Sequence, residues 1–312
     1  MRKQTKGIHH ITAIVGNPQE NIDFYAGVLG LRLVKQTVNF DDPGTYHLYF
    51  GDEQGSPGTI VTFFPWDDAH QGRIGGGQVG TTSYAVPEGA LPFWENRLND
   101  FAISYKKSVR FGETYLQFAD PHGLQLELVE RGQAKGNGWN FGKITSESAI
   151  QGFAGALLLS ASPELTAMLL EEVMGLERIG KEEGLIRYKS TSDIGNIIDL
   201  KMDEVPRGRM GVGTVHHIAW RANDDQDQMA WKAHLEANSY PVTPVQDRNY
   251  FNAVYFREHG DILFEIATDP PGFAIDEPLE GLGQALKLPP QFEPHREKIN
   301  QVLPPVQVRE IE

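Results

Sequence analysis

The chain has 312 residues, of which 40% are hydrophobic and 22% are charged. This composition suits a folded protein of about two domains and excludes an intrinsically disordered one. The formal net charge is -14. Because nucleic acids and anionic membranes are bound by basic surfaces, this excess of acidic side chains argues against both as partners.

The sequence contains no cysteine, which excludes disulfides, thiolate metal sites and thiol nucleophiles. The opening stretch, MRKQTKGIHH, lacks the apolar core of a signal peptide. The longest apolar stretch, around FAGALLLSA, is too short to span a bilayer. We therefore expect a cytoplasmic protein.

One pattern occurs four times along the chain. Each copy begins with a predicted strand, continues with a helical pattern and ends with short strands, which gives a βαβββ unit. Asn17-Pro18 and Ser162-Pro163 place a capping side chain before a proline at the first helical position. The four predicted units cover about residues 7–65, 79–130, 150–203 and 213–268.

The units suggest a simple division of the chain. We interpret the first two as an N-terminal pair within residues 1–140 and the last two as a C-terminal pair within residues 150–275. The proline-rich segment 276–312 is predicted to be a tail that packs on the body.

Two of the predicted first strands carry adjacent histidines. The first copy reads IHHITA at residues 8–13, and the fourth reads VHHIAW at residues 215–220. Because successive side chains of a strand point to opposite faces, His10 should share a face with Thr12, whereas His9 should lie on the other face. The same alternation applies to the fourth copy. We therefore expect only one histidine of each pair to point into a given cavity.

Comparison of the four copies locates candidate ligands. The slot of the second histidine holds a histidine in the first and fourth copies only; its occupants in chain order are His10, Tyr84, Gly155 and His217. The slot on the last strand holds an acid in every copy but the first, where it falls near Phe63; its other occupants are Glu127, Asp199 and Glu265. If the first and fourth copies pair, their slots supply His10, His217 and Glu265.

Two histidines and one carboxylate form the ligand set of non-haem Fe(II) oxygenases. Three protein ligands hold the metal, and the vacant positions accept a substrate oxygen and dioxygen together. The set carries only one negative charge, which suits a phenolate substrate. A zinc hydrolase could use the same three ligands, so the set alone leaves the metal open.

These features resemble a known superfamily. The repeated βαβββ unit, with ligands on its first and last strands, resembles the vicinal oxygen chelate superfamily of glyoxalases and extradiol dioxygenases. The run DRNYFNAVYFREHGDILFEIATDPPGF (247–273), the stretch GIHHIT and the tail EPHREKINQVLPP are similar to ring-cleaving dioxygenases of the hydroquinone 1,2-dioxygenase type. The resemblance covers nearly the whole chain.

The resemblance implies an α+β fold of four βαβββ modules in cupped mixed sheets. It also implies an enzyme that uses Fe(II) and O2 to cleave a hydroquinone or a catechol, in the degradation or detoxification of aromatic compounds. Its metal ligands correspond to His10, His217 and Glu265. The residues that line its active site correspond to His9, Thr12, His216, Arg248 and Tyr255.

One departure from the catechol 2,3-dioxygenase pattern bears on the substrate. Those enzymes place a histidine on the first strand of the third unit, where this chain reads FAGALLL. The missing ligand must therefore come from the first unit. This favours the hydroquinone-cleaving branch and a pairing of the first module with the fourth and of the second with the third.

Each candidate also has a structural interpretation. Tyr255 could be a packed tyrosine and Arg248 a surface ion pair, and we assign them to the site only because of the resemblance. His9 and His216 either orient the site or are satisfied histidines on the far face. Glu127 is interpreted as a structural remnant that is hydrogen-bonded locally, with a second metal site as the alternative. The remaining histidines are interpreted as solvated or structural: His47, His70, His122, His234, His259 and His295.

Two other functions remain compatible with the sequence. One is a glyoxalase-like isomerase or lyase, which would normally require four protein ligands. The other is a non-catalytic module that binds aromatic compounds. The sequence leaves open the ring substituents, the choice between hydroquinone and catechol, and whether the chain forms a homo-oligomer.

Overall fold

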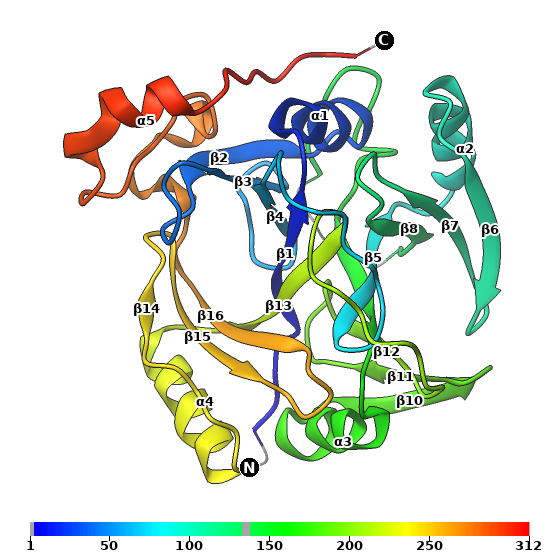
Figure 1. Cartoon of the computed structure of the whole chain (residues 1–312). Helices are drawn as coiled ribbons and strands as arrows, with labels where there is room; N and C mark the ends of the chain where they lie inside the picture. The colour runs from blue at the N-terminus through cyan, green and yellow to red at the C-terminus, as the bar shows by residue number, and fades with distance from the viewer. Residues whose placement is uncertain (1–2, 133–137, 312) are drawn as a thin grey trace.

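The computed structural model of the chain describes residues 3–132 and 138–311 and has the predicted α+β fold (Figure 1). Four βαβββ modules follow one another, and their strands form two curled sheets of eight strands each. Each sheet combines two modules that are not formed from the same half of the chain. The pairing of modules is the one predicted, first with fourth and second with third.

The first sheet contains the first and fourth modules in the order β14-β15-β16-β13-β1-β4-β3-β2. At its centre β1 and β13 are antiparallel, and each has the last strand of its own module as a parallel neighbour. The strands are β1 (Ile8–Val15), β2 (Arg32–Val38), β3 (Tyr46–Gly51), β4 (Ile60–Pro65), β13 (Thr214–Ala222), β14 (Gln246–Asp247), β15 (Phe251–Arg257) and β16 (Leu263–Pro271).

The second sheet repeats this topology with the second and third modules, in the order β10-β11-β12-β9-β5-β8-β7-β6. The division of the chain into an N-terminal and a C-terminal pair of modules stays a prediction of the sequence, since each sheet takes one module from either half. The strands are β5 (Gln78–Val86), β6 (Tyr105–Arg110), β7 (Glu113–Ala119), β8 (Gln125–Glu130), β9 (Gly152–Leu159), β10 (Glu177–Glu182), β11 (Leu185–Lys189) and β12 (Ile197–Lys201).

Each module contributes one helix, and the helices lie outside the curled sheets (Figure 1). They are α1 (Pro18–Ile22), α2 (Leu91–Asp100), α3 (Pro163–Met168) and α4 (Asp225–Ala237). The short helices α1 and α3 both continue into a π-helical turn. Gly30 and Gly175 follow these turns with φ of 68° and 71°, a conformation that glycine adopts without steric cost.

The two predicted helix caps differ. The Asn17 side chain accepts hydrogen bonds from the backbone N–H groups of Gln19 and Glu20, as predicted. The prediction for Ser162 is wrong, because its side chain makes no capping bond. Its backbone N–H instead donates to the Ser160 hydroxyl, which draws the residue into the preceding turn.

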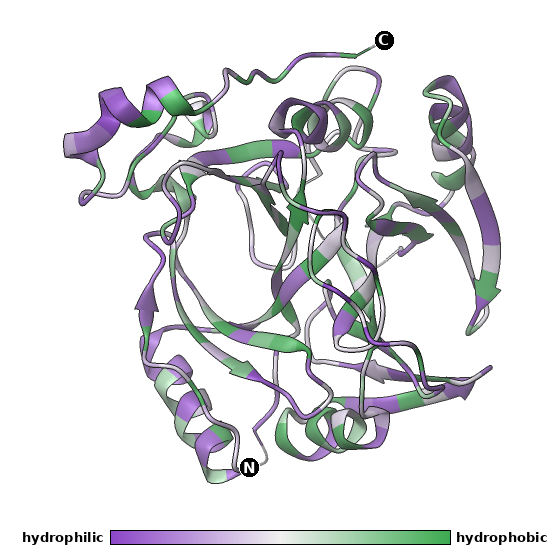
Figure 2. Cartoon of the chain, viewed as in Figure 1, coloured by the Kyte–Doolittle hydropathy of each residue, from purple (hydrophilic) through white to green (hydrophobic). Residues whose placement is uncertain are grey.

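The main hydrophobic core lies between the helices and the sheet faces that they cover. Helix α4, for example, buries Trp231 and Leu235 against β13 and β16. Figure 2 shows hydrophobic colour along the strands that curve round the centre and hydrophilic colour over much of the C-terminal helix. Among the described residues, no helix is both long and apolar enough to cross a membrane.

The chain after β16 lies along the edge strand β2. Lys35 of β2 is completely buried, and its ammonium group donates to the carboxylates of Asp276 and Glu277. Gln36 donates to the carbonyl of Gly283 at 2.6 Å. The segment contains short 3-10 helices at Phe273–Ile275, Leu279–Gly281 and Glu293–His295, and the helix α5 (Arg296–Val302).

This buried ion pair gives a first prediction. Replacing Lys35 by alanine leaves the Glu277 carboxylate buried without a cation, so we expect Lys35→Ala to lower the free energy of unfolding by about 3–5 kcal/mol. The measurement is urea unfolding followed by circular dichroism.

The control is Lys232→Ala. Lys232 forms an ion pair with Glu236 on the outer face of α4, and Glu236 is half exposed. An exposed pair of this spacing contributes only about 0.3–0.5 kcal/mol. Equal losses of stability in the two variants would contradict the anchoring role of Lys35.

Candidate metal site and aromatic pocket

His10, His217 and Glu265 meet on three adjacent strands. His10 lies on β1, His217 on β13 and Glu265 on β16, and β13 is hydrogen-bonded to both of the others. The Nε2 atoms of the two histidines are 3.3 Å apart, and they lie 3.4 and 2.9 Å from Oε2 of Glu265. All three side chains are buried, and one ligand atom from each lies within 4.8 Å of the others.

Both histidines of each pair face the same side of the sheet, so the prediction that they alternate is wrong. In the pairing of β1 with β13, β1 has an extra residue at His9, and β13 has one at His216. Such β-bulges re-aim side chains and are frequent next to functional sites. The core residues reflect this offset: they are Ile8, Ile11, Ala13 and Val15 in β1, and Val215, Ile218, Trp220 and Ala222 in β13.

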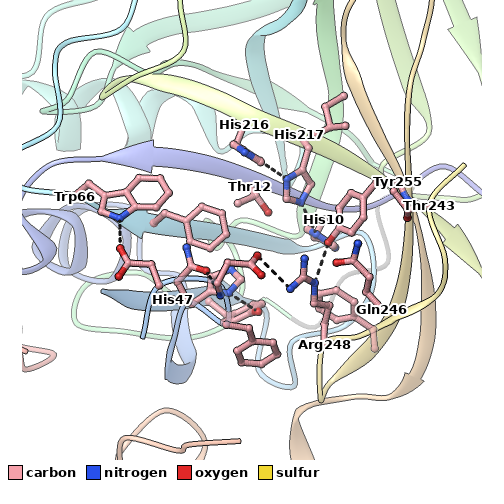
Figure 3. A pocket seen from close by; sticks show the side chains of 18 residues that line it. His10, Thr12, His47, Trp66, His216, His217, Thr243, Gln246, Arg248 and Tyr255 are labelled. Atoms are coloured by element: carbon pink, nitrogen blue, oxygen red, sulfur yellow. Dashed lines mark hydrogen bonds and ion pairs between the residues drawn. The ribbon is translucent and has the colours of Figure 1, made fainter. Parts of the chain in front are cut away.

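The bulges bring each second histidine against its neighbour. His9 Nδ1 lies 2.9 Å from His10 Nδ1, and His216 Nδ1 lies 2.8 Å from His217 Nδ1. His216 lines the pocket (Figure 3), whereas His9 is not part of the lining and its ring lies against that of Phe251. These contacts use the Nδ1 atoms of His10 and His217 and leave the Nε2 atoms of the same two residues directed at Glu265.

The pKa shifts of His216, His217 and Glu265 favour the binding of a cation. Burial lowers the pKa of His217, and burial followed by the charge of His217 lowers the pKa of His216 to about 3. Burial would raise the pKa of Glu265, but His10 and His217 outweigh it and hold this pKa below its ordinary value. Neither carboxylate oxygen of Glu265 receives a hydrogen bond within the described part of the chain. A buried carboxylate with two imidazole nitrogens beside it and no donor fits a divalent metal ion.

His10 and His217 of the triad line a pocket of about 450 Å³, and six other lining residues are Phe, Tyr or Trp. Thr12 lines it beside His10, as predicted. Tyr255 of β15 pairs directly with Glu265 across the two strands, and its hydroxyl lies 3.2 Å from Nε of Arg248 (Figure 3). The structure thus brings together all the predicted site residues. The aromatic side chains of the pocket are Phe40, Tyr49, Phe64, Trp66, Phe251 and Tyr255.

Arg248 extends between the pocket interior and its mouth. Burial would lower its pKa, but the neighbouring Tyr255 and then Asp41 raise it. The Arg248 guanidinium lies 3.5 Å from the carboxylate of Asp41, whose side chain is 81% exposed. A positively charged guanidinium group is therefore part of the pocket lining.

The structure corrects the role of one histidine. His47 was interpreted as solvated or structural, but its half-buried ring lines the pocket between Tyr49 and Phe64 (Figure 3). The available signal was weak: in YHLYFG the two polar aromatic residues His47 and Tyr49 are two positions apart and so share a face.

Strand register also corrects one of the predicted slots and defines another more closely. Ala219, two residues after His217, pairs with Glu265, and in the second sheet Ser83 pairs with Glu127. The residue equivalent to His217 is therefore Thr81. Tyr84 instead stacks on Phe153 in the core, so its assignment to this slot is wrong.

In the first module Thr12, two residues after His10, pairs with Thr62. Thr62 therefore occupies the fourth slot of the site, rather than Phe63, which packs in the core against Tyr25. The expectation that this slot holds no acid is unaffected.

The equivalent place in the second sheet is filled by arginine. Arg110 donates to Glu127 from both terminal nitrogens, at 2.8 and 2.6 Å, and to Asp199 from Nε at 2.8 Å. Arg187 adds a second cation beside Asp199. Glu127 is thus hydrogen-bonded locally, as predicted. Within the described residues, the only cluster of metal-ligating groups is the one around Glu265.

The sequence signature of the Glyoxalase/Bleomycin resistance protein/Dioxygenase superfamily matches residues 7–128 and 157–276. The chain belongs to this superfamily. The resemblance noted in the sequence is thereby confirmed.

Two relatives of this superfamily member carry functional names. A Bacillus subtilis protein provisionally named ring-cleaving dioxygenase MhqO is 66% identical over 312 residues, which is 100% of both chains. The chlorohydroquinone/hydroquinone 1,2-dioxygenase of Sphingobium indicum is 33% identical over 302 residues, which cover 93% of this chain and 94% of that protein.

Solved structures agree with the fold. A crystal structure from Bacillus subtilis, 66% identical in sequence, superposes with a TM-score of 0.98 over 99% of this superfamily member and 100% of that chain. Glyoxalase I from Zea mays superposes with a TM-score of 0.62 at 13% identity, over 84% of this chain and 92% of that one. At this identity the second match speaks for the fold alone.

The geometry predicts how metal affinity depends on the triad. We expect His217→Ala and Glu265→Ala each to weaken metal binding by more than the ~10–100-fold that follows loss of a hydrogen-bond partner behind a ligand. The measurement is the metal content of the anaerobically reconstituted protein. Full retention of metal by the His217→Ala protein would show that His217 is not a metal ligand.

The second sheet provides the matched control. Glu127→Ala removes the equivalent carboxylate and leaves Arg110 partly buried with one partner fewer, so we expect a loss of about 3–5 kcal/mol in the free energy of unfolding. Metal content per folded chain should equal that of the unaltered protein. A loss of metal in the folded Glu127→Ala protein would show that the second sheet also binds it.

Proposed function

We propose that this protein is an Fe(II)-dependent dioxygenase that cleaves the ring of a hydroquinone or a related aromatic diol. The observation that carries the proposal is the buried cluster of two histidines and one glutamate in a pocket with aromatic walls. This donor set is typical of non-haem Fe(II) oxygenases, because it leaves coordination positions free for two further ligands.

The fourth slot favours this function over a glyoxalase-like isomerase. Such an enzyme would normally require a fourth protein ligand, and here Thr62 stands in that slot with its hydroxyl engaged by Thr12 and His47. A purely binding module would have no use for Glu265, because a buried carboxylate without a donor costs stability unless a cation binds it.

The relatives support the class of reaction. Among them are a protein provisionally named as a ring-cleaving dioxygenase and one named for chlorohydroquinone and hydroquinone. The hydroquinone is therefore the substrate that we propose, with catechol as the alternative. We also propose a cytoplasmic location and a role in the breakdown or detoxification of such compounds.

Each group of the pocket has a part in this proposal. When bound, Fe(II) supplies a centre that joins the diol to dioxygen and carries electron density from one to the other. His9 and His216 hold the rings of His10 and His217 through their Nδ1 atoms. Arg248 places a positive charge beside the ionised hydroxyl, and Tyr255 holds a proton within reach of the developing anion.

The pocket walls exclude water around the ring. Phe251 lies 4.9 Å from His10 between ring centroids, and Phe64 lies 5.8 Å from His216. The planar ring of a diol bound in the pocket would be in contact with aromatic side chains such as these. Charged groups act more strongly in such a water-poor site than in solution.

Oxygen consumption tests the proposal. Protein reconstituted with Fe(II) under nitrogen is mixed with aerated methylhydroquinone or catechol, and the oxygen concentration and product absorbance are recorded. We expect uptake with the hydroquinone and a ring-opened product. Oxygen uptake with catechol alone would change the assigned substrate from hydroquinone to catechol. No uptake by iron-loaded protein would contradict the dioxygenase activity.

A single hydroxyl tests the part assigned to Tyr255. We expect Tyr255→Phe to lower kcat by about 10²-fold, the lower range for loss of a proton-transfer group, without loss of bound iron.

The matched control is Tyr188→Phe, which removes a hydroxyl bonded to Glu171 in the second sheet, away from the pocket. Unchanged kcat in the Tyr255→Phe protein would show that this hydroxyl takes no part in the reaction.

A further inference from the structure

A chain of four hydrogen-bonding side chains runs along one wall of the pocket. The hydroxyl oxygens of Thr12 and Thr62 are 2.9 Å apart. His47 Nε2 lies 2.8 Å from the Thr62 hydroxyl, and His47 Nδ1 lies 2.8 Å from the Tyr49 hydroxyl. Three strands contribute, since Thr12 is on β1, Thr62 on β4, and both His47 and Tyr49 on β3. This series of hydrogen bonds therefore depends on the pairing of three strands and not on one sequence motif.

The two ends of the chain have different surroundings. Thr12 pairs with His217 across β1 and β13 and lines the pocket next to the triad. Tyr49 lines the same pocket with Asn39 and Asp41, which belong to the loop after β2. Thr62, in the interior of the chain, occupies the slot where the three other modules are built to hold an acid. In place of a ligand, this quarter of the site contains a series of hydrogen-bonded side chains.

The hydrogen bonds of this series can all be donated in one direction or all in the other. Burial, followed by the charges of His10 and His217, lowers the pKa of His47, so its ring is neutral and carries one donor and one acceptor nitrogen. The four groups hold four exchangeable protons, and three bonds use three of them. The fourth proton is donated either by Thr12 toward the triad or by Tyr49 toward the pocket. Passage of one proton along the chain interconverts these two arrangements and moves no net charge into the wall.

We infer that Thr12, Thr62, His47 and Tyr49 form a relay that carries the proton of a substrate hydroxyl away from the metal site. The relay rests on the proposed function, because it needs a diol that ionises at the triad. The substrate O–H bond breaks as a Thr12 O–H bond forms. The Thr12 proton passes to Thr62, and the Thr62 proton passes to His47 Nε2.

The remaining half of the transfer completes the balance. His47 releases its Nδ1 proton to the Tyr49 oxygen, and Tyr49 releases its own proton to water in the pocket. No electrons are transferred, and His47 ends as the other neutral tautomer. Passage of a proton in the reverse direction, to the departing product, restores the first tautomer.

The relay complements the opposite wall of the pocket. Arg248 provides a fixed charge there, and it cannot accept a proton. Tyr255 hydrogen-bonds to Arg248 and lies over His217, with 5.7 Å between ring centroids. The wall of β3 and β4 is thus the side on which a proton can leave, whereas the wall of β15 stabilises the anion that remains.

Ionisation can be followed before any oxygen is present. Nitrohydroquinone changes colour when its hydroxyl ionises, so it is mixed under nitrogen with Fe(II)-loaded protein in a stopped-flow spectrometer. We expect Thr62→Val and Tyr49→Phe to slow the colour change at least ~10-fold, below the 10²–10⁴-fold typical of proton-transfer groups because buffer can substitute. Bound iron and the dissociation constant of nitrohydroquinone should not change.

Buffer dependence separates a relay from a structural effect. In the two variants, higher concentrations of imidazole buffer should accelerate the colour change, because the small base takes over the transfer. The unaltered protein should be insensitive to the buffer. The matched control is Thr37→Val. Thr37 is the cross-strand neighbour of His47 between β2 and β3, and its buried hydroxyl has no hydrogen-bond partner among the described residues.

The possible results are distinct. Ionisation at the rate of the unaltered protein in both Thr62→Val and Tyr49→Phe overturns the relay. So does a slow rate that is independent of buffer or that accompanies loss of iron. If the unaltered iron-loaded protein neither binds nor ionises nitrohydroquinone, the proposed function fails and the relay with it.

Discussion

The antiparallel contact of β1 with β13 is the interaction on which the rest of the site depends. It joins histidines that are 207 positions apart in the chain and brings their Nε2 atoms to 3.3 Å. Each strand carries one bulge, and each bulge turns two consecutive histidines toward the same face. The parallel neighbour β16 then places Glu265 beside them. A slip of one residue in this register would direct the ligands into the hydrophobic core, so packing of the core and assembly of the site are one event.

The two sheets share a topology but differ in how they neutralise their central acids. In the first sheet Glu265 faces two imidazole rings and receives no hydrogen bond from the described residues, an arrangement that a metal ion would complete. In the second sheet Glu127 and Asp199 face Arg110, whose guanidinium provides both the charge and the donors. A duplicated unit has thus been used once as a site and once as a structural ion-pair network. Buried acids in equivalent positions do not by themselves indicate function; their partners do.

The pocket also depends on the chain that follows the last module. Tyr49 packs against Phe273 and Tyr250, with 5.2 and 6.0 Å between ring centroids, and Lys35 on the neighbouring strand is bonded to Asp276 and Glu277. The C-terminal segment therefore supports the strands β2 and β3 that carry one wall of the pocket. The opposite wall, with Arg248 and Tyr255, belongs to the fourth module. Substrate would lie between segments contributed by the beginning and the end of the chain.

The sequence by itself determined the βαβββ repeat, the fold class and the three residues of the triad, because repeated strands with histidines and an acid in matching slots leave a direct trace in the order of residues. It misplaced Tyr84 because the alignment of the copies depends on pairing between strands, and it missed the common facing of the twin histidines because of a bulge. Each first strand contains a bulge, and its only local sign is apolar residues spaced by three and then by two, as in Ile8, Ile11 and Ala13.

Only the tertiary structure decided which histidine faces which neighbour, that His47 belongs to the pocket, and that Arg110 occupies the second sheet. These features depend on register between strands far apart in the chain. Hydrogen bonds across a sheet set that register, and they leave no signature in any single stretch of sequence.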